Sequence, residues 1–275
     1  RRPGARRPAR ERYRRLDRAM RELTAFPCDG DTLIGTLDDA PGTTGLLIVS
    51  GGNELRCGAH RGMALLAADL AATGVPVFRF DRRGIGDSDG ANHGYQHSGP
   101  DIAAAARTFR TLAPHMTRMV GFGGCDAATA LALFHRDAAV DSLVLANPWI
   151  GDEDDALPPA SAIRSHYADR LRDPRQWLRA LSGGVNIRKA IRGLQKASAK
   201  SGEPTNPIAA RMAVAMVDTP RTILLAQRDN TAIRFEEAWR EADSIRHRAT
   251  DSHSFARPGD GEWLREQLLT AIRAA

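Results

Sequence analysis

The segment MVGFGGCDAATALALF, residues 119–134, contains the residue best suited to covalent chemistry, Cys125. Apolar residues lead into it, and small residues at helical spacing follow it. Gly123 lies two positions before Cys125, as is typical of the strained strand-to-helix turn that exposes a nucleophile, and the small residue Ala127 replaces the usual glycine two positions after it. The N-terminus of the following helix favours a thiolate. The pattern therefore predicts a catalytic cysteine; the alternative is a buried, small apolar residue.

A nucleophile on such a turn needs a base within hydrogen-bond reach, and in this arrangement an acid and then a histidine follow it along the chain. The segment TILLAQRD ends a predicted late strand with Asp229, and RATDSHSFARPG places His253 in a loop after the last strand. We predict that His253 takes the thiol proton and that Asp229 holds the imidazole in one tautomer. The alternatives are a helix cap for Asp229 and a solvent-facing loop position for His253.

The oxyanion of an acyl-transfer reaction needs two hydrogen-bond donors. The backbone N–H of Asp126, at the start of the helix after Cys125, is one candidate. The segment SGGNELRCGAHRG follows an apolar strand and offers the N–H of Gly52 or of Asn53 as the second, unless it is an ordinary glycine turn. Arg56 in the same segment is a candidate substrate contact or a residue at the start of a helix.

The elements that position these residues alternate between short apolar runs and amphipathic stretches. An Asp-Gly turn between two apolar runs, near residue 30, predicts an antiparallel hairpin. The later strands are apolar on both faces and separated by helices, which predicts a mostly parallel, twisted sheet with helices on both faces. The expected strands are 45–52, 75–81, 118–123, 141–148, 221–230 and a short one near 245–250, and the expected helices are 60–74, 99–113, 126–137, 231–242 and 261–275.

The alternation stops between residues 149 and 219, where basic amphipathic stretches replace the strands. We interpret 149–219 as a helical lid inserted into one α/β core made of 23–148 and 220–275. Trp149, Tyr167 and Trp177 are candidates to line a substrate pocket beneath this lid. The alternative is that these aromatic side chains pack the lid against the core.

The first 22 residues hold ten arginines against three acidic residues, within a chain of net charge +6. We interpret 1–22 as a disordered arm; the alternative is contact with nucleic acid, anionic lipid or an acidic partner. Arginine content alone does not predict a specific nucleic-acid partner.

The composition argues against a membrane-spanning, secreted, disulfide-bonded or metal-binding protein. No apolar run reaches the roughly 18 residues of a membrane span, and the charged N-terminus lacks the apolar segment of a secretory signal. The three cysteines do not form an even, closely spaced set, so we expect a reducing, cytoplasmic environment. Their spacing gives no metal signature, and no cofactor is expected.

Several segments also resemble known proteins. FRFDRRGIGDSDG, residues 78–90, resembles the D-x-R-G-x-G-x-S loop of the α/β-hydrolase superfamily, whose role there is largely structural, so Asp87 and Ser88 are not expected to be catalytic. GGNELRCGAHRGMALLAADLAATGVPVFRFDRRGIGDSDG, the glycine-Cys-Asp elbow, LVLANPW, HYADRLRDPRQWLRALSGG and RDNTA are similar to the exosortase A system-associated hydrolase 1 family. This resemblance implies the α/β-hydrolase fold, a cysteine at the elbow as in dienelactone hydrolases, and a setting beside protein-sorting and exopolysaccharide machinery.

Together these observations predict a hydrolase or acyl-transfer enzyme that acts on an ester or thioester through an acyl-cysteine intermediate. Its substrate would be a small or carrier-linked acyl compound. The alternative is a non-catalytic binding or scaffold protein of the same fold, with the basic arm contacting an anionic partner. The acyl group, the leaving group and the oligomeric state do not follow from the sequence.

Overall fold

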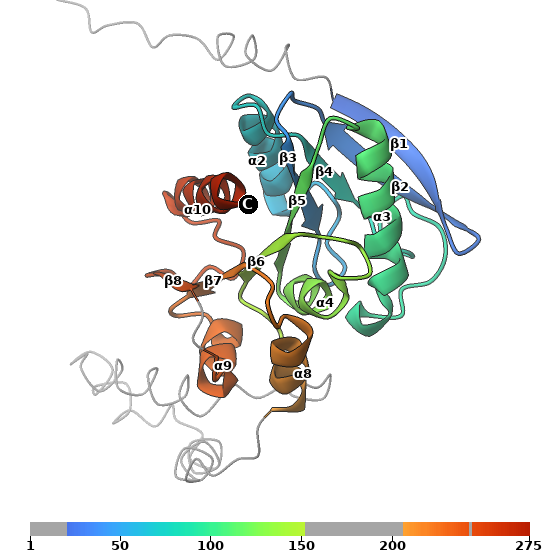
Figure 1. The fold of residues 1–275 in the computed structure, drawn as a ribbon. Helices are drawn as coiled ribbons and strands as arrows, with labels where there is room; N and C mark the ends of the chain where they lie inside the picture. The colour runs from blue at the N-terminus through green and yellow to red at the C-terminus, as the bar shows by residue number, and fades with distance from the viewer. Residues whose placement is uncertain (1–20, 152–205, 242–243) are drawn as a thin grey trace, which may run out of the picture.

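The computed structural model describes residues 21–151, 206–241 and 244–275 of the chain. Residues 1–20 of the predicted arm and 152–205 of the predicted lid lie outside the described residues. The described residues contain one eight-stranded sheet with the strand order β1-β2-β4-β3-β5-β6-β7-β8. This is the predicted α/β-hydrolase architecture, an antiparallel hairpin on an otherwise parallel sheet (Figure 1).

The sheet begins with the predicted hairpin. β1 (Arg21–Cys28) pairs antiparallel with β2 (Asp31–Asp38), with Cys28 opposite Asp31 at the turn. The two turn residues, Asp29 and Gly30, have φ angles of 50° and 93°. Two positive φ angles match the right-handed twist of the strands, which explains the Asp-Gly pair here.

Strands β3 to β8 run parallel and carry the functional candidates at their carboxyl ends. Because the carboxyl ends of parallel strands meet at one edge of a sheet, residues distant in sequence come together there. β2 joins the hairpin to these strands by pairing antiparallel with β4. Their bounds are β3 (Thr44–Val49), β4 (Val77–Phe80), β5 (Arg118–Gly124), β6 (Ser142–Ala146), β7 (Arg221–Ala226) and β8 (Ser244–Arg248).

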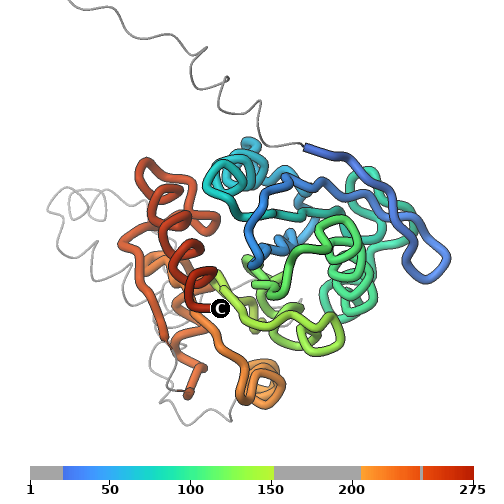
Figure 2. The backbone as a smooth tube through the Cα atoms, turned by 45° about the horizontal axis from the view of Figure 1, so that its top comes forward, coloured from blue at the N-terminus to red at the C-terminus, as the bar shows by residue number. Residues whose placement is uncertain are grey.

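Helices cover both faces of the sheet (Figures 1 and 2). α2 and α10 share an apolar core with one face, and α3, α4, α8 and α9 share a second core with the other. Figure 2 shows the blue hairpin and the red C-terminal segment at opposite ends of the molecule. The α-helices are α2 (Gly62–Ala71), α3 (Gly99–Leu112), α4 (Asp126–Phe134), α8 (Pro207–Ala215), α9 (Asn230–Ala238) and α10 (Asp260–Ala274), and the short 3-10 helices are η1 (Ala59–Arg61) and η2 (Tyr95–His97).

Helix α8 lies inside the range predicted as a lid, but it packs in the core. Met212 is fully buried there beside α4. Asn206 caps the helix by accepting hydrogen bonds from the N–H groups of Ile208 and Ala209, and its amide donates to the carbonyl of Ile150 at 3.0 Å. The prediction of a lid therefore applies only to residues 152–205, which lie outside the described residues. Among the helices of the described ranges, none has both the length and the apolar character needed to cross a bilayer.

Candidate active site

Cys125 lies on a strained turn between β5 and α4. Its φ of 57° and ψ of −128° form a backbone conformation that residues with a side chain rarely adopt. The turn is anchored by the Cys125 N–H, which donates to the Ala146 carbonyl at 2.9 Å, and by the Cys125 carbonyl, which accepts from the Trp149 N–H at 3.1 Å. Glycine is needed at position 123, because a Cβ there would come within 2.9 Å of the Ala127 backbone. The thiol of Cys125 remains partly exposed.

The structure brings His253 and Asp229 together beside this turn. His253 Nδ1 lies 3.0 Å from Asp229 Oδ2, and Asp229 is 12% exposed, whereas His253 is 40% exposed. The same carboxylate oxygen accepts the Ala232 N–H at 3.0 Å and caps α9, so Asp229 also has the capping role considered as its alternative. The hydrogen bond to Asp229 and, next, the neighbouring Cys125 raise the pKa of His253 from 6.5 to about 10. The imidazole is therefore charged at neutral pH.

Two buried polar side chains hold the loop that carries His253. Asn147, which follows β6 and is fully buried, donates from its amide to the His253 carbonyl at 2.7 Å and accepts the Ala226 N–H at 2.8 Å. Asp260, at the start of α10, accepts the Thr250 hydroxyl at 2.6 Å. Neither residue was predicted from the sequence. The one available signal for Asn147 was a polar residue directly after a buried strand, in the segment LVLANPW.

The loop after β3 is tied to the elbow through the side chain of Asp126. The Gly52 N–H donates to Asp126 Oδ1 at 2.5 Å, and Arg82 Nη2 donates to the Gly52 carbonyl at 2.6 Å and lies 3.3 Å from Asp126 Oδ2. The prediction that Gly52 donates to an oxyanion is therefore wrong, because a carboxylate already accepts its N–H. Within the described hydrogen bonds, the Asn53 N–H has no acceptor. The Asp126 N–H begins α4 and has no carbonyl partner within the helix.

Arg56 does not have the predicted role in substrate contact. Its guanidinium forms an ion pair with Asp81, lies 3.1 Å from Asp87 and donates from Nε to the Thr36 hydroxyl at 3.1 Å. These contacts turn it toward the end of β4 and away from the lining of the cavity beside Cys125. The prediction is wrong because local acids satisfy the guanidinium. Its role is to anchor the loop after β3.

The predicted aromatic lining is not assembled from the described residues. Trp149 meets the elbow through its backbone, and its carbonyl accepts the Thr129 hydroxyl at 2.5 Å. The described lining of the cavity does not include its indole, which is a correction to the sequence-based expectation. Tyr167 and Trp177 lie outside the described residues.

The D-x-R-G-x-G-x-S segment has the structural role that its resemblance implied. The Ser88 hydroxyl is buried, donates to the Asp81 carbonyl at 2.8 Å and accepts the Ile34 N–H at 2.9 Å. Arg83 pairs with the buried Asp101 at 2.6 Å. These bonds fix the turn after β4 beside the elbow.

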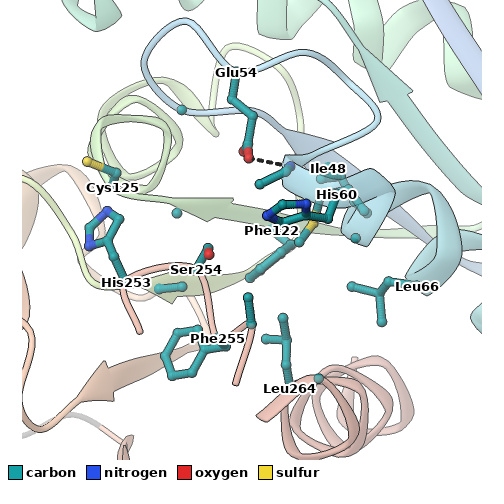
Figure 3. A pocket seen from close by; sticks show the side chains of 18 of the residues that line it. Ile48, Glu54, His60, Leu66, Phe122, Cys125, His253, Ser254, Phe255 and Leu264 are labelled. Atoms are coloured by element: carbon teal, nitrogen blue, oxygen red, sulfur yellow. Dashed lines mark hydrogen bonds between the residues drawn. The ribbon is translucent and has the colours of Figure 1, made fainter. Parts of the chain in front are cut away.

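A cavity of about 670 Å³ opens beside the elbow and is lined by Cys125 and His253 (Figure 3). Figure 3 shows these two residues on one side of the view, Glu54 above and Leu264 below. Taken together, the site offers a partly exposed thiol, a charged imidazole, two open backbone N–H groups and a neighbouring cavity. This set of groups is suited to acyl transfer.

Comparisons with known proteins support the fold and identify the family. The profile of the Hydrolase_4 family, described as serine aminopeptidase S33, matches residues 45–230. No curated protein sequence matches the chain significantly.

Among solved structures, an esterase from Pyrococcus furiosus superposes with a TM-score of 0.62 at 16% identity, covering 95% of this chain and 93% of the esterase. An α/β-hydrolase from Penicillium has a TM-score of 0.61 at 17% identity and covers 93% of this chain and 98% of its own. A serine hydrolase homologue from Coxiella burnetii has a TM-score of 0.57 at 16% identity, over 90% of this chain and 96% of its own. At these identities the likeness shows a shared fold.

Proposed function

The chain belongs to the Hydrolase_4 (serine aminopeptidase S33) family, and from this premise we propose that it is a hydrolase or acyl-transfer enzyme of esters or thioesters that uses Cys125 as its nucleophile. One observation carries the proposal: Cys125 stands on a strained, partly exposed turn and lines the same cavity as His253, whose Nδ1 lies 3.0 Å from Asp229. Within the family, we further propose membership of the exosortase A system-associated group. The supporting segments are the loop after β3, the glycine-Cys-Asp elbow and RDNTA.

The charge of His253 supports cysteine over the serine that gives the family its name. An imidazole with a pKa of about 10 keeps its proton at neutral pH, so it is a poor base for a hydroxyl group. A thiol ionises far more easily than a hydroxyl, and a thiolate beside an imidazolium is an active nucleophile without further proton transfer. The N-terminus of α4 adds partial positive charge next to the sulfur.

The reaction follows from the positions of these groups. The Cys125 thiolate forms a bond to the carbonyl carbon, and the carbonyl electron pair moves to oxygen, where the N–H groups of Asp126 and Asn53 stabilise it. The oxyanion then collapses, the bond to the leaving group breaks, and His253 gives its proton to that group. In hydrolysis, the now neutral His253 takes a proton from water as the water attacks the acyl-thioester, which releases the acid and restores the thiolate.

The same chemistry favours activated acyl groups. Attack of a thiolate on a thioester exchanges one thioester for another with little change in energy, and esters have reasonable leaving groups. An amide must expel an amine and depends far more on proton donation. We therefore propose esters and thioesters as substrates over peptides.

The test is to incubate the purified protein with a panel of acyl esters and acyl thioesters and to measure turnover and intact mass. We expect turnover and a mass increase equal to one acyl group, and both should disappear in Cys125→Ala. Cys57→Ala is the matched control, because Cys57 is the other partly exposed thiol and lies on the loop after β3. Cys28 adds little background, because burial raises the pKa of its thiol to about 11.

A second assay separates the enzyme from the scaffold alternative. A thiol-reactive probe should label Cys125 rapidly at neutral pH, and His253→Ala should slow this labelling. Equal labelling rates in both proteins, with no acyl adduct from any substrate, would favour a non-catalytic protein.

A further inference from the structure

The cavity beside Cys125 penetrates the layer between the sheet and helices α2 and α10. Its apolar walls belong to that layer: Ile48 comes from β3, Phe122 from β5, Leu66 from α2 and Leu264 from α10. Its volume of about 670 Å³ lies within the range of roughly 300–1,000 Å³ for small-molecule sites. The described part of its lining therefore belongs to the fold's own core.

Small residues keep this space open. Gly62 begins α2 and Gly261 lies in the first turn of α10, and both line the cavity. A Cβ added at either position would meet no atom within 4 Å, and neither glycine has a positive φ. Glycine destabilises a helix relative to residues with side chains. Neither backbone strain nor close packing requires glycine at these positions, so both leave open space beside the cavity.

The catalytic candidates lie at one side of the cavity, whose lining also includes the polar residues Glu54, His60, Ser254 and Arg257. Cys125 and His253 line it beside the elbow, whereas Leu66 and Leu264 lie away from them in the view of Figure 3. A carbonyl carbon placed at the sulfur would therefore have an apolar space beside it. The carboxylate of Glu54, which also lines the cavity, accepts the Ala59 N–H at 2.8 Å and is engaged with its own loop.

We propose that this cavity is the acyl subsite, and that the substrates are esters or thioesters of straight-chain fatty acids of medium length. The inference rests on the proposed function, because it places the carbonyl at Cys125. The methylene groups then pass between Phe122 and the two helices, with Leu66 and Leu264 as the far walls. The leaving group stays outside, on the side of the loop after β3.

The test is a series of esters with one leaving group and acyl chains from acetyl to dodecanoyl. Each methylene buried in the cavity should raise kcat/KM about fourfold, until the chain fills the space. Gly62→Leu and Gly261→Leu each add a side chain at a residue that lines the cavity, and we expect the ratio of octanoyl to butanoyl kcat/KM to fall by on the order of tenfold. Ala72→Leu, at the exposed end of α2, is the matched control and should keep the wild-type ratio.

The outcomes separate the two proposals. A flat chain-length series with a normal acyl-enzyme, or the same ratio in both glycine variants, would overturn the acyl subsite and leave the proposed function intact. Preference for a leucyl amide over every fatty ester would also overturn it.

If no ester is turned over and no acyl adduct forms, the proposed function is wrong. The acyl subsite is then tested by ligand binding alone. Dodecanoate should then bind Cys125→Ala, and the added Gly62→Leu change should weaken that binding about tenfold or more. If dodecanoate binds Cys125→Ala with and without the Gly62→Leu change equally, or binds neither, the proposal of an acyl subsite is wrong as well.

Discussion

Replacing Cys125 by serine tests whether a charged His253 makes this site dependent on a thiol. At pH 7.5 a group with a pKa of about 10 is neutral in only about 0.3% of molecules. A serine hydroxyl needs that neutral fraction, because the imidazole must accept its proton as it attacks. Cys125→Ser should therefore lose up to about 300-fold in kcat/KM at this pH, because a thiol, which ionises far more easily than a hydroxyl, depends less on the neutral imidazole.

The serine variant should also have a different pH profile. Substitution removes the Cys125 contribution to the pKa of His253 but keeps the larger contribution of Asp229, so this pKa should lie between 6.5 and about 10. The kcat/KM of Cys125→Ser should then rise about tenfold per pH unit from near pH 7 until the pH approaches that pKa. The wild-type value should depend much less on pH over the same interval, because a thiol ionises far more easily than a hydroxyl and needs the neutral imidazole less.

The assay is kcat/KM for one activated ester between about pH 6 and pH 10, corrected for spontaneous hydrolysis. Cys57→Ser introduces the same change at the other partly exposed thiol and should retain the wild-type profile. A Cys125→Ser enzyme that is fully active by about pH 7, with a plateau like that of the wild type, would refute the reasoning. It would show that His253 titrates near its free value and that the site has no requirement for sulfur.

Two further predictions concern the residues that support His253. Asp229→Asn and Asp229→Ala should both lower the pKa of His253, measured by NMR titration, but asparagine retains the cap of α9. Chemical denaturation should therefore find Asp229→Ala less stable by about 1 kcal/mol than Asp229→Asn, and equal stabilities would argue against the cap. Asn147→Gly keeps the left-handed backbone, φ 45°, but leaves the buried Ala226 N–H and the partly buried His253 carbonyl without these partners, so unfolding should become easier by about 2 kcal/mol and kcat should fall. Wild-type stability and kcat in this variant would contradict the positioning role of Asn147.

The elements of the fold were predictable because each depends on local periodicity. The Asp-Gly turn indicated the hairpin, and the apolar runs around 45–52 and 118–123 correspond to β3 and β5. The order of nucleophile, acid and histidine along the chain was enough to select Asp229 and His253, which the structure places 3.0 Å apart. These inferences needed only the residue types near each strand end.

The supporting contacts were not predictable in the same way. Asn147 bonds to a residue 106 positions later, and Gly52 to one 74 positions later, so neither contact leaves a local pattern. Arg56 was misassigned because an arginine near a glycine loop has the same local signal whether it meets a substrate or a buried Asp81. The cavity is the space left between the sheet and helices α2 and α10. Gly62 and Gly261 line this space, so they indicate it only once the two helices are placed.

Asp126 connects the two halves of the proposed oxyanion site. Its backbone N–H begins α4 beside Cys125, while its carboxylate accepts the Gly52 N–H and pairs with Arg82. The second proposed donor, the N–H of Asn53, directly follows Gly52 in the chain. Its position therefore depends on the Asp126 carboxylate, which accepts the Gly52 N–H. Hydrogen bonds to a charged group contribute about 1.5–3 kcal/mol each, enough to hold the loop in place before substrate arrives. An acid directly after the nucleophile therefore supplies preorganisation, on which stabilisation of a developing oxyanion depends.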